Sequence, residues 1–466
     1  MRLPSKKVFL INLFFSYFSL SYGSEDKRLT KYANANPLAP ESKVYDWPRF
    51  NGPFDNATTL ENGLSTESGK LKINKIWELS KGEGYASPAI SNNRLILFHL
   101  EEGKEIIEAR NPTTGDKIWS YSYPAKYRDR YGYSNGPRAS PLIWKNKVYA
   151  HGVTAWLTCL DLKTGDLIWK RDLKSEFEIP DYFFGKGSNP IVTEDALILN
   201  VGGKNNECVV AFNLLTGKTK WIVKDSWGAS YSSPVNAIIH ERNVCLIFTG
   251  GESRPPHGGL LIIDAKSGQK LSRFPWRSSS YESANAVPPI PIPGNRVFLS
   301  ECYEKGGVMI SIDAKFNTKI EWHKPEFNIH WMTPLVVGDY IYGIAGRHQR
   351  GAELFCAEIE KGKEVWRDRL SWQTQFMGHE LNLELFRGSL LGVNDDFIAL
   401  SELGSLMLLK MSPAGFRILD TKQLFFAPGT WTLPSLSQGL LYIMQNETDR
   451  SSGKEPRLLC YDLRAG

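Results

Sequence analysis

Two pairs of residues have the chemistry to hold an ion. Arg138 and Lys186 carry positive charges in segments rich in glycine and aromatic residues, where they can donate charge-assisted hydrogen bonds to an anion. Glu282 and Asn285 stand three residues apart and offer the carboxylate and amide oxygens that a hard cation prefers. The alternatives are that both cations are solvated surface residues and that two oxygens are too few for a metal site. No metal ligand set is therefore assigned.

Histidine and aromatic residues add further candidates. A histidine near a binding site can act as a base, although a lone histidine more often only bonds its neighbours. The segment 371–387, which contains His379, is longer than a simple connection requires and favours a binding or lid role. No catalytic residue is assigned. The candidate ligand-binding residues are Arg138, Lys186, Tyr231, Glu282, Asn285, His330, Trp331, His379 and Trp431.

Several other chemistries lack their sequence motifs. The chain has no Gly-x-Ser-x-Gly elbow, no His-Glu-x-x-His, no phosphate-binding glycine-rich loop with lysine and no EF-hand loop. It also has no block of like charges, so nucleic-acid and anionic-membrane binding find no support in the composition. Hydrolase and nucleotide-dependent functions are therefore not favoured.

A repeat of about 50 residues sets the elements that must position these candidates. A complete copy places Asp or Asn first, Gly four residues later and Trp four residues after that, and a period of this size predicts a propeller or a solenoid. The complete copies are Asn111-Gly115-Trp119, Asp161-Gly165-Trp169 and Asn213-Gly217-Trp221, and the weaker ones are Asp264-Gly268, Asp313-Asn317, Glu358-Gly362-Trp366, Met411-Gly415 and Asp462-Gly466.

Each copy is expected to be one four-stranded propeller blade. Turn-forming pairs such as Asn92-Asn93 and Lys145-Asn146 lie between apolar runs and predict an inner hairpin. A third strand then enters the Asp-x-x-x-Gly turn, and a fourth strand carries Trp, which can pack on the flat glycine turn. Trp276 and Trp322 stand off this spacing, so the fourth and fifth blades are expected to be irregular.

An N-terminal strand is expected to close the ring. The chain stops at Gly466 before an eighth Trp, but Lys75-Ile76-Trp77-Glu78 supplies one upstream. Pairing this strand with the C-terminal three leaves no open sheet edge and gives a blade of residues 431–466 plus 73–79. The predicted fold is therefore an all-β, eight-bladed β-propeller with four-stranded blades.

Loops from the outer strand of one blade to the inner strand of the next converge on the central channel of such a ring. Their composition, aromatic, glycine and charged, suits a binding site, although such residues also simply pack loops. The expected loops are 82–86, 131–138, 182–188, 229–231, 281–285, 328–331, 371–387 and 429–431.

The termini and cysteines indicate export without a disulfide framework. Residues 1–23 resemble a signal peptide, residues 24–45 a flexible lead-in, and residues 46–466 the propeller. Loss of the signal would remove Arg2, Lys6 and Lys7 and no acidic residue, which lowers the formal charge from +6 to +3. No cysteine follows the apolar run and no other stretch could span a bilayer, so neither a lipid anchor nor a membrane span is expected.

The six cysteines show no C-x-x-C or adjacent pair. Equivalent buried strand sites are expected for Cys159, Cys356 and Cys460, whereas the places of Cys208, Cys245 and Cys302 are less clear.

The repeat resembles the tryptophan-docking motif of the pyrroloquinoline-quinone-like (PQQ-like) eight-bladed propellers. That superfamily includes quinoprotein alcohol dehydrogenases and a lipoprotein of outer-membrane barrel assembly. The opening Asp46-Trp47-Pro48-Arg49-Phe50-Asn51-Gly52-Pro53 is similar to the Trp-Pro-x-Phe-Arg-Gly-Pro start of an exported branch common in planctomycete and verrucomicrobial-type bacteria. The resemblance covers residues 46–466 and is specific for fold rather than for activity.

Two functions from different classes follow from this resemblance. In the family's enzymes the quinone and Ca²⁺ lie over the central mouth, with a disulfide between neighbouring cysteines and with acidic and amide metal ligands. This chain lacks the neighbouring cysteine pair, and it also lacks the lipidated cysteine of the assembly lipoprotein. The favoured hypothesis is a non-catalytic binding or assembly scaffold in the periplasm or outside the cell. It would hold a small ligand or another exported protein, and no cofactor is assigned to it. The alternative is a PQQ- and calcium-dependent alcohol dehydrogenase-like oxidoreductase, with Arg138, Lys186, Glu282 and Asn285 near the cofactors.

Overall fold

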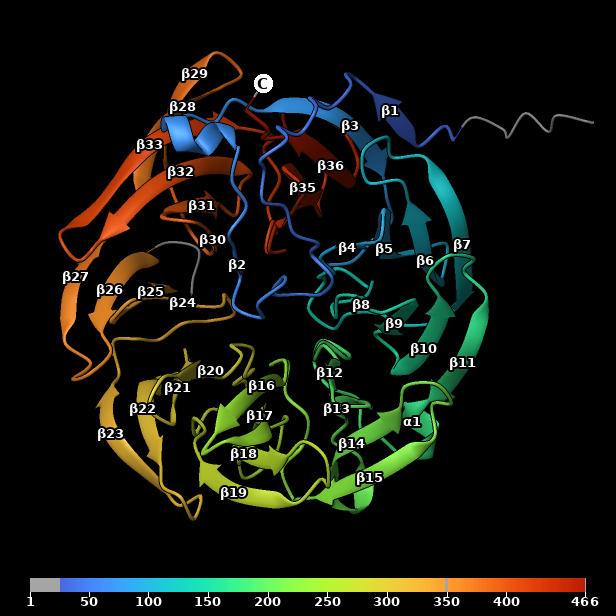
Figure 1. Ribbon diagram of the computed structural model, residues 1–466, viewed down its shortest axis with the longest axis vertical. Helices are drawn as coiled ribbons and strands as arrows, with labels where there is room; N and C mark the ends of the chain where they lie inside the picture. Colours follow the sequence, from blue (N-terminus) through green and yellow to red (C-terminus); the bar gives the residue numbers. More distant parts are fainter. Residues whose placement is uncertain (1–25, 348–350, 466) are drawn as a thin grey trace, which may run out of the picture.

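Eight four-stranded blades surround a central axis (Figure 1). The computed structural model describes residues 26–347 and 351–465, and the expected signal peptide and Gly466 lie outside this part of the chain. Seven blades are antiparallel meanders, because their apolar, β-branched runs are separated by tight turns, and in the eighth blade an N-terminal strand adds as the fourth antiparallel strand.

The first four blades follow one another along the chain. Blade 1 contains β4 (Ala89–Ser91), β5 (Arg94–Glu101), β6 (Lys104–Arg110) and β7 (Lys117–Pro124). Blade 2 contains β8 (Leu142–Trp144), β9 (Lys147–His151), β10 (Trp156–Asp161) and β11 (Leu167–Asp172). Blade 3 contains β12 (Ile191–Thr193), β13 (Ala196–Asn200), β14 (Glu207–Asn213) and β15 (Thr219–Lys224), and blade 4 contains β16 (Val235–Ile239), β17 (Arg242–Thr249), β18 (Gly259–Asp264) and β19 (Lys270–Pro275).

The remaining blades complete the ring. Blade 5 contains β20 (Ile290–Ile292), β21 (Arg296–Glu301), β22 (Gly306–Ile312) and β23 (Thr318–Lys324), and blade 6 contains β24 (Leu335–Val337), β25 (Tyr340–Ala345), β26 (Glu353–Glu358) and β27 (Glu364–Asp368). Blade 7 contains β30 (Ser389–Val393), β31 (Asp396–Leu400), β32 (Ser405–Ser412) and β33 (Gly415–Gln423). Blade 8 contains β34 (Ser435–Ser437), β35 (Leu440–Gln445), β36 (Arg457–Asp462) and β3 (Asn74–Ser80).

The Asp-x-x-x-Gly turns join neighbouring blades through tryptophan. Asp161 Oδ1 accepts the backbone N–H groups of Lys163 and Thr164 at 2.8 and 2.9 Å, and Gly165 has a φ of 79°. The indole of Trp119 from blade 1 lies against Gly165, where an added Cβ would meet the ring at 2.6 Å, and its Nε1 donates to the carbonyl of Leu162 at 3.0 Å. Glycine is therefore required both for the left-handed backbone and for the space that the indole fills.

The same docking recurs around the ring. A Cβ added to the glycine of the next turn would lie 2.5–3.0 Å from an indole in three further pairs, which are Trp77 on Gly115, Trp169 on Gly217 and Trp221 on Gly268. These contacts confirm the structural interpretation of the repeat and explain how each blade is fixed to its neighbour.

Trp322 corrects the expectation that blade 5 lacks a regular tryptophan. It pairs with Met309 as Trp169 pairs with Cys159, packs on Gly362 and donates to the carbonyl of Ile359 at 2.8 Å. The irregular part of blade 5 is instead its turn. Strands β22 and β23 continue pairing to Ile312 and Thr318, so Asp313 lies two residues further along than Asp161.

Blade 4 has no tryptophan at the docking position. Ser272 occupies it, opposite Ile262, and Trp276 lies just beyond the end of β19, where it stacks on Phe274. The blade therefore departs from the repeat, as its spacing predicted. Its inner turn is His240-Glu241, and both residues adopt the positive φ typical of such hairpins.

Strand β3 closes the ring as predicted. It pairs antiparallel with β36, and Trp77 faces Cys460 in the ladder. Trp77 is fully buried, and its Nε1 donates to the carbonyl of Pro112 in blade 1 at 3.1 Å. Cys159 and Cys356 hold the equivalent position beside Trp169 and Trp366, and all six cysteines are buried and unpaired.

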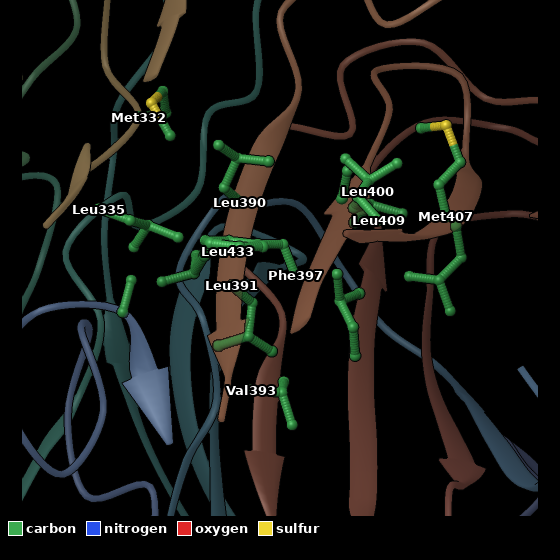
Figure 2. Packing of buried hydrophobic residues seen from close by; sticks show 14 of the residues in the cluster. Met332, Leu335, Leu390, Leu391, Val393, Phe397, Leu400, Met407, Leu409 and Leu433 are labelled. Carbon is green, nitrogen blue, oxygen red and sulfur yellow. The ribbon is translucent and has the colours of Figure 1, made fainter. Parts of the chain in front are cut away.

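The apolar side chains of the inner strands pack between blades. Figure 2 shows Leu390, Leu391 and Val393 of β30 in a cluster that also contains Leu335 of blade 6 and Leu433 beside blade 8. This cluster extends over blades 5–8, the first two strands of blade 1 and the N-terminal segment, so these parts of the ring share one core.

The N-terminal segment runs into the middle of the ring (Figure 1). Strand β2 (Thr58–Thr59) pairs parallel with β30 of blade 7, Trp47 exchanges backbone hydrogen bonds with Ile90 of blade 1, and Ile143 N donates to Pro48 O at 2.8 Å. Glu61 accepts the N–H groups of Gln438 and Gly439, which form the inner hairpin turn of blade 8. The segment therefore enters from the face that carries these hairpin turns.

A few elements lie outside the repeat. Strand β1 (Leu29–Lys31), within the expected lead-in, adds a fifth strand beyond β3, and β28 (Ser371–Phe376) with β29 (His379–Glu384) forms a separate hairpin. The helices are η1 (Ser65–Ser68), α1 (Leu173–Glu176) and η2 (Lys204–Asn206). None of the helices in the described ranges is long and apolar enough for a membrane span.

Candidate functional site

A cavity of about 390 Å³ opens on the face opposite the inner hairpin turns. We call it the central cavity. Loops that lead into the inner strands supply most of its wall, as predicted for a propeller. Its lining residues are Phe50, Tyr85, Tyr133, Arg138, Phe184, Gly187, Asn189, Tyr231, Ser233, Ala284, Ala286, Tyr303, His330, Trp331, Arg347, Arg387, Trp431, Thr432 and Leu433.

Aromatic rings form a continuous wall in this cavity. The ring centroids of His330 and Trp331 are 4.0 Å apart, and Trp331 is 4.9 Å from Trp431. Trp431 in turn contacts Tyr85 at 5.3 Å and Tyr133 at 5.4 Å. Beyond them the wall continues through ring contacts of 5.9 Å between Tyr133 and Phe184, 5.5 Å between Phe184 and Tyr231, and 5.7 Å between Tyr303 and His330.

The hydroxyl groups of two wall tyrosines are used within the protein. Tyr231 donates to Glu252 Oε1 at 2.7 Å and accepts the N–H of Phe184 at 3.0 Å. Tyr85 accepts the N–H of Ser134, and burial raises its pKa to about 12. These rings therefore contribute mainly carbon surface to the central cavity, while their polar ends hold neighbouring loops together.

Three arginines provide the positive charge of the wall. Arg138 donates to Asp129 Oδ2 at 2.8 Å, and Arg387 donates to both oxygens of Glu402 at 2.7 and 3.0 Å. The Arg387 guanidinium lies 5.1 and 4.8 Å from the ring centroids of Trp331 and Trp431, within the range of a cation–π contact. Among the described residues, the lining contains no Asp or Glu.

The structure brings five of the nine candidate residues together in the central cavity. They are Arg138, Tyr231, His330, Trp331 and Trp431. The hydroxyl of Tyr303 lies 3.3 Å from Nε2 of His330 and positions that ring beside Trp331.

Glu282 and Asn285 do not converge on a common site. Glu282 is exposed and accepts a hydrogen bond from Ser280, whereas Asn285 is buried and donates to the carbonyl of Thr249 at 3.2 Å. The turn between the two residues directs their side chains to different surroundings. Neither side chain lines the central cavity.

Lys186 and His379 also lie away from the central cavity. Lys186 is buried, donates to the carbonyl of Pro180 at 3.0 Å and sits 3.7 Å from the ring centroid of Tyr182; burial holds its pKa well below the ordinary value. His379 is exposed on β29, in the hairpin that projects at the periphery of the ring (Figure 1). Of the long segment 371–387, only Arg387 lines the cavity.

Three wall residues come from segments that the sequence did not associate with the site. Tyr303 and Arg347 follow the second strands of blades 5 and 6, and Phe50 belongs to the N-terminal segment. Loops after second strands open on the same face as loops into inner strands, so this geometry could have identified Tyr303 and Arg347. Phe50 has no counterpart in the repeat.

Replacing Arg387 by methionine is expected to lower the free energy of unfolding by about 2 kcal/mol. Methionine keeps an apolar stem beside Trp331 and Trp431 but removes the ion pair with Glu402, whose side chain is fully buried. The effect is smaller than that of a fully buried pair because Arg387 retains some exposure. Urea unfolding followed by circular dichroism measures it.

The double variant Arg387→Met/Glu402→Gln is the matched control, since it also removes the buried charge. It is expected to recover about half or more of the free energy of unfolding that Arg387→Met loses. A double variant as unstable as Arg387→Met would show that the ion pair does not account for the effect.

The blades, the tryptophan docking and the central cavity define an eight-bladed PQQ-like β-propeller. A family model described as outer membrane protein assembly factor BamB matches residues 103–368, more than half of the chain, and the chain belongs to this family.

Two curated relatives match parts of the chain. BamB of Shewanella oneidensis is 22% identical over 273 residues, which are 54% of this chain and 61% of the relative. The dehydrogenase subunit of the quinone alcohol dehydrogenase of Gluconobacter oxydans is 26% identical over 171 residues, which are 34% of this chain and 22% of the relative. The matches thus span less than two thirds of either relative.

Solved structures share the fold. The quinohemoprotein alcohol dehydrogenase of Comamonas testosteroni has a TM-score of 0.62 at 13% identity and covers 90% of this chain and 81% of its own. At this identity the likeness concerns the fold alone.

Proposed function

We propose that the chain is an exported, non-catalytic binding propeller that holds a ligand or a partner segment in the central cavity. The observation that carries this proposal is the continuous aromatic wall with three arginines and no lining carboxylate. Such a wall supplies apolar contact area and hydrogen-bond donors. It offers no acidic side chain as a general base.

Export is part of the same proposal. The positively charged start, the apolar run to Leu20 and the small residues near Gly23 support a signal peptide. A location in the periplasm or outside the cell is also consistent with the relative BamB, an outer membrane protein assembly factor.

The residues present do not fit the calcium site of the quinoprotein resemblance. Ca²⁺ takes about six to eight oxygen ligands. Among the described residues, no group of three or more His, Cys, Asp or Glu side chains is placed to hold a metal ion. Glu282 and Asn285, the candidates for such ligands, lie apart, so we derive no catalytic step through a quinone or calcium.

A cofactor titration tests the proposal against the dehydrogenase alternative. The full chain is incubated with PQQ and CaCl₂, and reduction of an artificial dye in the presence of ethanol is followed together with tryptophan fluorescence. We expect no alcohol-dependent dye reduction, because the acidic oxygens that would hold the metal are not assembled. A reconstituted quinoprotein alcohol dehydrogenase is the positive control. Dye reduction that requires alcohol, quinone and calcium together would overturn the non-catalytic assignment.

A further inference from the structure

Arg347 differs from the other two described arginines of the central cavity, because no carboxylate of the described residues pairs with it directly and Glu282 acts on it only through a longer-range charge interaction. Arg138 and Arg387 are paired with Asp129 and Glu402, whereas Arg347 forms no ion pair within 4.0 Å in the described part of the chain. Its side chain is exposed, and its guanidinium lies 4.3 Å from the ring centroid of Tyr303. The stacked guanidinium therefore keeps its N–H donors available to an incoming group.

The balance of donors and acceptors indicates what the cavity can accept. Its charged lining consists of arginines, which only donate hydrogen bonds. A ligand rich in hydroxyl groups would also need strong acceptors, and the lining has no carboxylate to provide them. The complementary ligand is therefore rich in acceptors and negatively charged. A guanidinium binds a carboxylate through two parallel hydrogen bonds, which adds direction to this preference.

The rest of the wall resembles the centre of a protein interface. Trp, Tyr and Arg are the residues that carry most binding energy in such interfaces, and Lys, Asp and Glu are depleted there. In the part of the chain that the structure describes, the lining has Trp331, Trp431, four tyrosines and three arginines, and no Lys, Asp or Glu. A cavity of about 390 Å³ admits a few side chains rather than a folded domain. Composition and size together favour a short segment of a polypeptide.

The N-terminal segment of the chain itself contributes to the cavity wall. Phe50 lines the cavity, and its segment is held inside the ring by Thr333 Oγ1, which donates to Asn51 Oδ1 at 3.1 Å, and by the Trp47–Ile90 backbone pair. A segment that enters from the open face therefore meets Phe50. This geometry suits the tip of a loop or a chain terminus.

Building on the proposed function, we propose that the central cavity binds a short acidic segment of a partner protein. An aromatic or long aliphatic side chain of that segment packs against Trp331 and Trp431. A neighbouring Asp or Glu carboxylate pairs with Arg347. The contact is one of binding only, with no bond made or broken.

Selection from a phage-displayed heptapeptide library on the immobilised full chain tests this proposal. We expect enriched sequences in which Asp or Glu adjoins Trp, Phe or Leu. A synthetic peptide of the enriched sequence is then measured by fluorescence polarisation beside its Asn/Gln counterpart. The acidic form should bind at least about tenfold more tightly, and its affinity should fall as ionic strength rises.

Two charge-matched variants connect the binding to the cavity. Arg347→Gln should weaken the acidic peptide by about tenfold or more and leave the Asn/Gln peptide nearly unchanged. Arg417→Gln removes the same charge from the exposed face of β33 and should have no effect. Because Arg347 is exposed, its variant should unfold at the same urea concentration as the wild-type chain.

Each other outcome contradicts the proposal in a distinct way. An acidic segment at Arg347 would be excluded if basic or uncharged peptides were enriched, or if no peptide were enriched. It would also be excluded if Arg347→Gln and Arg417→Gln lost affinity for the acidic peptide equally. Binding of oligogalacturonate that depends on Arg347, without peptide enrichment, would assign the cavity to an acidic sugar and leave the proposed binding function intact. Quinone- and calcium-dependent alcohol oxidation would remove the proposed function as well.

Discussion

Trp77→Ala is expected to lower the free energy of unfolding by about 3–5 kcal/mol, the range for removal of a large buried aromatic side chain. Trp77 is fully buried, its Nε1 bonds to Pro112 O at 3.1 Å, and its indole covers Gly115 of blade 1. It also lies on the strand that joins the two ends of the chain. The substitution therefore opens a cavity at the contact that closes the ring.

Urea unfolding followed by far-ultraviolet circular dichroism measures this loss without relying on tryptophan emission. Trp366→Ala is the matched control, because Trp366 holds the equivalent position in blade 6, donates to Ser412 O and is only partly buried. Trp366→Ala should lower the free energy of unfolding less than Trp77→Ala does, by about 1 kcal/mol or more. Limited proteolysis should also cut the Trp77 variant faster between residues 60 and 75. Equal losses in the two variants would argue against a special contribution of ring closure.

The fold could be predicted because each blade repeats a local rule. Gly165 must adopt a positive φ and leave room for Trp119. The same pair of residue types at the same spacing therefore identifies such a turn elsewhere in the sequence. The closing strand was identifiable for the same reason, since Trp77 supplies the tryptophan that the eighth copy of the repeat lacks. Trp322 was misjudged because counting from Asp313 assumes a constant hairpin length, whereas the ladder in blade 5 is longer.

The site was only partly predictable because loop side chains follow no period. The sequence could place Arg138 and Lys186 in neighbouring converging loops, yet the first lines the central cavity and the second is buried against Tyr182. In a strand or helix the period would have separated inward from outward residues. Phe50 was missed because the segment that carries it belongs to no repeat and its place inside the ring depends on contacts with distant blades.

Glu105 lies at the joint between blades 1 and 2. Glu105 of β6 is fully buried and accepts the N–H of Val153, in the turn before β10, at 2.7 Å. Burial raises its pKa to about 7 from the ordinary 4.5, against the opposing effects of Val153 N–H, Tyr123 and Lys170. The carboxyl group is therefore ionised in the folded chain only at a cost, and that cost depends on pH.

Glu105→Gln is accordingly expected to raise the free energy of unfolding by roughly 2–3 kcal/mol at about pH 8 and to leave it unchanged at about pH 4. Below 4.5 the carboxyl group is protonated in both the folded and the unfolded chain, so a neutral amide changes little. As pH rises from 4.5 through about 7, the unfolded chain loses its proton first, and the wild-type protein loses stability that the variant retains. The amide oxygen can still accept the Val153 N–H.

Urea unfolding across this pH range measures the difference, with Glu102→Gln in the exposed turn before β6 as the control for the lost charge. A Glu105→Gln variant that is less stable at every pH would mean that the carboxylate stabilises the joint between the two blades.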